Sequence, residues 1–159
     1  TVIGLGNSEM GDDGVGVALV EMLRAELEAG VACPRAGGAE APLRLVTADR
    51  DPVYAGACVA EGGPALLVDA VDMGREPGAC RVFRPGDADF PAPPRGGSTH
   101  ALAGAGIVEM ARALGCADGL RLMGIQFADM APGRGLSPAL QGRLPGLLET
   151  IKQEVGLLL

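Results

Sequence analysis

Two aspartates and one histidine are the residues whose types and placement suggest chemistry. Asp13 follows the Gly-rich turn after the first predicted strand, Asp69 lies at the end of a continuous apolar run, and His100 is the one histidine of the chain. In open α/β sheets, ligands bind at the carboxyl ends of the strands, where a fold of that class would bring these side chains together. Two carboxylates and one imidazole suit a divalent first-row metal, and three protein ligands leave coordination positions open for a substrate.

Each of these residues also has a purely structural explanation. Asp12 is predicted to be the N-cap of the first helix, and Asp13 would favour the positive end of the same helix. Asp69 would bond a neighbouring turn, and His100 would cap the helix that follows it. The functional hypothesis therefore depends on the joint placement of the three residues.

Other chemistries have weaker support in the sequence. Gly4 and Gly6 begin a dinucleotide-binding pattern, but Glu9 replaces its third glycine and two aspartates follow where a pyrophosphate would bind. The sequence contains no GK[ST], HExxH or GxSxG motif, and its four cysteines include no CxxC pair, so we expect reduced thiols. A small nucleotide-binding domain remains an alternative that a nucleotide titration would test.

The elements that must position these residues alternate along the chain. Glycine and proline mark loops at 32–42 and 84–98, and we expect the second loop to be mobile and to close on a substrate. Hydrophobic patterning predicts strands at 2–5, 43–47, 65–71, 79–83 and 120–127, and helices at 13–28, 52–60, 101–114 and from 138 onward.

Strands that alternate with helices predict an α/β fold with a mostly parallel sheet and helices on both faces. The link at 74–78 is too short for a parallel crossover. We therefore expect the strands before and after it to form an antiparallel pair, which makes the sheet mixed.

Composition bounds the class of protein. The 159 residues predict a single domain over 1–159, and a net charge of −7 argues against nucleic-acid binding. No apolar run reaches the length that spans a membrane, and the first residues resemble a strand rather than an export signal. We therefore expect a cytoplasmic protein with no nucleic-acid or membrane partner.

Four motifs together resemble the hydrogenase maturation protease family, and they follow the family's order along nearly the whole chain. The family's histidine segment is matched by Ser98-Thr99-His100 with a following helix that carries Glu109. The other motifs are Gly4-Leu5-Gly6-Asn7 through Asp12-Asp13-Gly14-Val15-Gly16, Leu67-Val68-Asp69-Ala70-Val71-Asp72, and the closing pair Gly124-Ile125-Gln126 and Gly135-Leu136-Ser137-Pro138.

The resemblance implies a three-layer α/β/α sandwich with a mixed, mostly parallel five-stranded sheet. It implies an aspartic-type endopeptidase that removes the C-terminal extension of a nickel-loaded [NiFe] hydrogenase large-subunit precursor. In such an enzyme, Asp13, Asp69 and His100 bind nickel carried by the substrate and are the catalytic residues. Many members have glutamate where Asp13 stands, and Phe127 replaces a frequent proline.

The partner is the precursor, and we expect the enzyme to be a monomer that holds metal weakly or not at all by itself. A metal-binding or metallochaperone module without peptidase activity would use the same ligands and remains an alternative.

Overall fold

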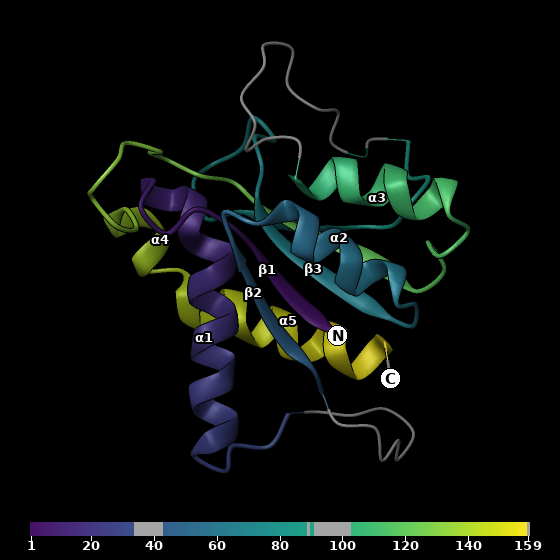
Figure 1. Cartoon of the computed structure of the whole chain (residues 1–159). Coiled ribbons are helices and arrows are strands. Elements are labelled where there is room, and N and C mark those ends of the chain that lie inside the picture. The colour runs from purple at the N-terminus through teal and green to yellow at the C-terminus, as the bar shows by residue number, and fades with distance from the viewer. Residues whose placement is uncertain (34–42, 89, 91–102, 159) are drawn as a thin grey trace.

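A computed structural model describes residues 1–33, 43–88, 90 and 103–158 of the chain. A sheet of five strands lies between two layers of helices (Figure 1). The strands are β1 (Val2–Gly6), β2 (Leu45–Asp49), β3 (Ala65–Ala70), β4 (Cys80–Phe83) and β5 (Leu120–Ile125). The helices are the 3₁₀ turn η1 (Gly11–Gly14), α1 (Val15–Glu28), α2 (Pro52–Ala60), α3 (Ala103–Ala113), α4 (Pro138–Gln141) and α5 (Leu144–Leu158).

The sheet has the strand order β2-β1-β3-β5-β4. Strands β2, β1, β3 and β5 are parallel, while β4 is antiparallel to β5. The predicted mixed α/β/α architecture is therefore confirmed. The expected direct pairing of β3 with β4 is wrong, because β5 lies between them. The link from β3 to β4 crosses the end of β5, where Gly78 and Ala79 hydrogen-bond to the backbone of Gln126, each at 2.8 Å.

Each face of the sheet has its own apolar core. Alternate residues of β1 and β3, such as Val2 and Val68, pack against α1 and α5. The residues between them, such as Ile3 and Leu67, pack against α2 and α3 (Figure 1). A side-chain period of two therefore divides the apolar residues between the two helical layers. Among the described residues, no helix is long and apolar enough to cross a membrane.

Several element boundaries differ from those predicted. Helix α1 begins at Val15 rather than at Asp13, because residues 11–14 form the separate turn η1. The final helical segment is two helices, α4 and α5, that flank Gly142 and Arg143. Ser137 does cap α4, with Pro138 as its first residue. Most of the predicted mobile loop, residues 89 and 91–98, and the predicted cap of the following helix lie outside the described residues.

Two glycines allow α1 to pack directly on the sheet. A Cβ atom added to Gly16, in the first turn of α1, would lie 2.2 Å from the carbonyl oxygen of Val68 and 2.5 Å from that of Leu5. A Cβ atom on Gly4 would lie 2.3 Å from the carbonyl oxygen of Gly16. Side chains at these positions would push the helix outward. The start of α1 and the turn before it therefore rest on the backbones of β1 and β3.

This close packing predicts opposite effects of glycine-to-alanine substitution at two helical positions. Gly16→Ala places a methyl group against two carbonyl oxygens and should lower the free energy of unfolding by about 3 kcal/mol. Gly146→Ala in α5 has no atom within 4 Å of the new Cβ, so its better helix propensity should stabilise the protein by about 0.5–1 kcal/mol. Urea unfolding of both variants measures this. Equal effects of the two substitutions would show that the packing of α1 does not depend on the close approach of Gly16 to the sheet.

Candidate active site

Asp69 lies near the carboxyl end of β3, on the face of the sheet that α3 covers. Its side chain is buried, with the residue only 5% exposed. Its Oδ2 atom accepts a hydrogen bond of 3.2 Å from the N–H of Gly104, in the first turn of α3. A Cβ atom on Gly104 would lie 2.9 Å from this oxygen, so a glycine lets the start of α3 sit on the carboxylate. The free N–H groups at a helix start favour negative charge there.

Asp13 reaches the same place from the turn η1. The residue is 4% exposed. Its carbonyl oxygen lies against Gly6 at the end of β1, where an added Cβ would be 1.8 Å from that oxygen. Gly6 also has a φ of 124°, a conformation that side chains disfavour. The backbone of the turn is therefore seated on the end of β1, and β3 runs beside that strand.

The two carboxylates interact electrostatically. Burial and, next, the negative charge of Asp13 raise the pKa of Asp69 to about 7. The hydrogen bonds that Asp69 receives from the backbone N–H groups of Gly104 and Ala70 act in the opposite direction and are outweighed. A buried acidic pair of this kind favours a shared proton or a cation near it. The structure thus places the carboxylates of Asp13 and Asp69 where they interact electrostatically.

His100, the third predicted site residue, lies outside the described residues. Within residues 1–33, 43–88, 90 and 103–158, no three His, Cys, Asp or Glu side chains gather in a way that could hold a metal ion. The described part of the chain therefore contributes two carboxylates to the predicted metal site. Two carboxylates fit a divalent cation in charge and in oxygen donors.

Asp12 does not have its predicted role as a helix cap. The N-cap of α1 is Gly14, and no side chain caps that helix. The fully buried carboxylate of Asp12 instead accepts hydrogen bonds from the loop at 126–137, which we call the β5–α4 loop. Burial alone would raise the pKa of Asp12, but the hydrogen bonds from Ser137, Asp129 and Ala128 hold it below its usual value. Asp12 is thus an anionic link between η1 and this loop.

Two further polar residues shape this edge of the sheet. The carboxylate of Asp49, at the end of β2, accepts hydrogen bonds from the backbone N–H of Ser8 at 3.0 Å and from its hydroxyl at 2.6 Å. The Oε1 atom of buried Gln126 accepts hydrogen bonds from the N–H groups of Met73 at 2.7 Å and Arg75 at 3.2 Å. Sequence analysis did not identify either role. The sequence feature that could have identified Asp49 and Gln126 is their position at strand ends, which also led to Asp69.

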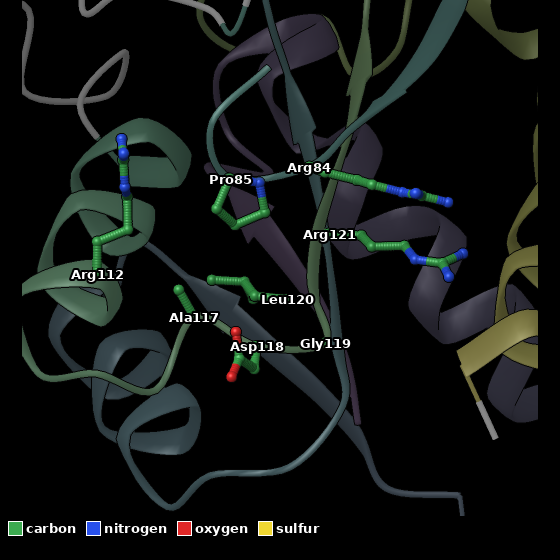
Figure 2. Close-up of a pocket in the computed structure, with 8 residues that line it drawn as sticks. All are labelled: Arg84, Pro85, Arg112, Ala117, Asp118, Gly119, Leu120 and Arg121. Carbon is green, nitrogen blue, oxygen red and sulfur yellow. The ribbon is translucent and has the colours of Figure 1, made fainter.

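A cavity of about 380 Å³ lies at the opposite edge of the sheet (Figure 2). It adjoins Leu120, the first residue of β5, whereas Asp69 pairs with Gly124 near the other end of that strand. Arg121 does not point into the cavity but forms an ion pair with Glu154 of α5. The lining residues are Arg84, Pro85, Arg112, Ala117, Asp118, Gly119, Leu120 and Arg121. This cavity is therefore separate from the carboxylate pair.

The fold and the site together define an α/β/α protein with a buried acidic pair at the carboxyl edge of its sheet. The sequence model of the family described as hydrogenase maturation protease, HycI, matches residues 62–154. The chain belongs to the hydrogenase maturation protease family. It is thus an endopeptidase of hydrogenase maturation, and this membership does not favour a metal-binding module without peptidase activity. The matched residues include Asp69 and His100, while Asp13 precedes them.

Solved structures show the same fold at low sequence identity. The hydrogenase maturating endopeptidase HybD from E. coli is 24% identical, with a TM-score of 0.68 over 94% of this chain and 87% of that one. The [NiFe] hydrogenase maturation protease HycI from Thermococcus kodakarensis KOD1 is 22% identical, with a TM-score of 0.63 over 97% and 90% of the two chains. A hydrogenase 2 maturation peptidase from Thaumarchaeota archaeon SCGC_AB-539-E09 is 18% identical, with a TM-score of 0.61 over 98% and 97%. No curated protein sequence matches the chain.

The proton affinity of Asp69 predicts how stability depends on pH. An ordinary aspartate has a pKa of 3.8, and that of Asp69 is about 7, so the folded state binds the proton more tightly than the unfolded state does. This carboxyl therefore lowers the free energy of unfolding progressively as pH rises from about 4 to about 7. Asp69→Asn removes the effect and should gain up to ~4 kcal/mol relative to wild type between pH 4 and pH 8.

Urea unfolding at the two pH values measures this gain. Asp118→Asn is the matched control, because Asp118 is an exposed carboxylate at the opposite edge of the sheet. The control should show the same difference from wild type at both pH values. If Asp69→Asn behaves like the control, Asp69 is not protonated near neutral pH.

Proposed function

We propose that the protein removes the C-terminal extension of a [NiFe] hydrogenase large-subunit precursor that already carries nickel. Asp13, Asp69 and His100 bind the nickel of that substrate through its open coordination positions. The observation that carries this proposal is the buried carboxylate pair, in which burial and the charge of Asp13 raise the pKa of Asp69 to about 7. Such a pair gains most from a divalent cation, since the cation compensates both charges at once.

The substrate metal then acts as a template. Coordination by residues on η1 and β3 fixes the position of the nickel relative to the sheet. The peptide bond to be cut is covalently joined to the chain that holds the nickel, so its position is fixed as well. A precursor without nickel lacks this anchor. The enzyme would therefore process assembled precursors and leave unassembled ones intact.

The carboxylate pair also supports an aspartic-type activity. Aspartic proteases also use two aspartates whose mutual repulsion raises one pKa, and in the free enzyme the raised pKa of Asp69 keeps a proton on this pair. When nickel binds, the proton on Asp69 must leave, because the ligand is the carboxylate form. Binding of a nickel-loaded precursor should therefore release about one proton well below pH 7 and about half a proton at pH 7, which links metal recognition to the protonation state of the site.

We further propose that residues 1–159 form one domain that works as a monomer in the cytoplasm on the precursor. Helices cover both faces of the sheet, in agreement with a monomer (Figure 1). The net charge of −7 supports a protein partner rather than nucleic acid.

Substitution of the site residues tests the assignment. Asp13→Ala, Asp69→Ala and His100→Ala should each lower the rate of precursor cleavage by about 100-fold or more, because each removes a direct metal ligand. Cleavage of a nickel-loaded precursor, followed by gel mobility, measures the rate. Asp118→Asn serves again as the exposed-carboxylate control and should retain the wild-type rate. Full processing by His100→Ala would refute the three-ligand site.

The affinity of the free protein for nickel gives a separate test. Three protein ligands leave the coordination shell incomplete, so the isolated protein should bind Ni²⁺ weakly and lose it on gel filtration with a chelator. Metal analysis of the eluted protein measures the bound nickel. A stoichiometric metal that survives prolonged chelation would contradict the proposal and indicate a resident catalytic metal.

A further inference from the structure

The buried carboxylate of Asp12 makes four hydrogen bonds to the β5–α4 loop. Its Oδ2 atom accepts from the N–H groups of Ala128 at 2.8 Å and Asp129 at 3.0 Å, and from the hydroxyl of Ser137 at 2.9 Å. Its Oδ1 atom accepts from the N–H of Ser137 at 2.6 Å. These bonds join both ends of the loop to one side chain. Charge-assisted hydrogen bonds of this kind are among the strongest in proteins.

The backbone of η1 and its neighbours strengthens the same contact. The N–H of Asp12 donates to the carbonyl of Asp129 at 2.8 Å, and the N–H of Gly133 donates to the carbonyl of Glu9 at 2.8 Å. Gly11 has a φ of 56°, and a Cβ atom there would lie 2.5 Å from the carbonyl oxygen of Asp129. The turn and the β5–α4 loop are thus held together over several residues, and they lie side by side in Figure 1.

We infer that Asp12 is a positioning residue for the cleavage reaction, which aims the carboxylate of Asp13 at Asp69 by locking η1 to the β5–α4 loop. The next residue along the turn is Asp13, whose carbonyl oxygen is seated on Gly6. The turn is therefore fixed on one side by the end of β1 and on the other by the bonds of Asp12. The inference rests on the proposed function, since it requires Asp13 to act on the substrate.

Asparagine at position 12 isolates this role. Asp12→Asn keeps the size of the side chain, but one oxygen that accepts hydrogen bonds becomes an NH₂ group that only donates. Whichever way the amide turns, that group faces an N–H or hydroxyl of the loop. The substitution therefore weakens the hydrogen bonds between position 12 and the β5–α4 loop without leaving a cavity. The carboxylates of Asp13 and Asp69 remain.

Steady-state cleavage of the nickel-loaded precursor tests the inference. Asp12→Asn should lower kcat at least about tenfold and change KM less than about threefold, because positioning of Asp13 affects the reacting geometry more than the docking of the precursor. Val155→Ala, a substitution of a buried residue in α5, is the control for lost stability and should retain the wild-type kcat at a temperature where both variants are folded. Thermal unfolding establishes that temperature.

The outcomes separate this inference from the proposed function. A kcat within twofold of wild type for Asp12→Asn, with Asp13→Ala inactive, overturns the role of Asp12 alone. A fully active Asp13→Ala overturns the proposed function first. Should Asp12→Asn not fold, Ser137→Ala removes the hydroxyl that donates to Asp12, and with it the side-chain cap of α4, while the backbone bonds to Asp12 remain. Its kcat, measured at a temperature where the variant is folded, should fall about two- to fivefold. An unchanged kcat for that variant overturns the inference as well.

Discussion

Direct contact between main chains at the start of α1 is the constraint on which the site depends. Gly4 and Gly16 let the helix lie on β1 and β3, and Gly6 lets the backbone of Asp13 lie on the end of β1. Protein interiors have little room to compensate for an added atom, so such contacts fix distances more tightly than side-chain packing does. The carboxylate of Asp13 on this turn is consequently held where it interacts with the carboxylate of Asp69 on β3.

The resulting pair of carboxylates is costly for the stability of the free protein. Two buried acidic groups repel each other, and burial withholds the water that would stabilise their charge. Stability is therefore lost at the proposed active site, as is common in enzymes. Under the proposed function, a cation presented by a precursor would relieve this cost, and the free energy stored in the free enzyme would contribute to recognition of the loaded substrate.

The fold was largely predictable from the sequence, and the site was predictable in part. Alternating apolar patterns and glycine-rich turns predict the helices and strands. The position of Asp69 at the end of its strand predicts that its side chain lies at the carboxyl edge of the sheet. The strand that pairs with β4 was not predictable. The short link at 74–78 excludes a parallel crossover from β3 to β4, but it does not show that β5 lies between these two strands. The role of Asp12 was not predictable either, since local patterning favours an N-cap and the partners of its side chain lie 116, 117 and 125 residues away.

The length of those separations has a consequence for how the protein is made. Contacts between distant parts of a chain form only after both parts have left the ribosome. The turn that carries Asp12 and Asp13 is synthesised earlier than Ser137, which follows 125 residues after Asp12. Strand β5, which pairs with β3, also emerges late. The link between η1 and the β5–α4 loop therefore forms only after Ser137 has emerged, and until then η1 is not held in the position described above.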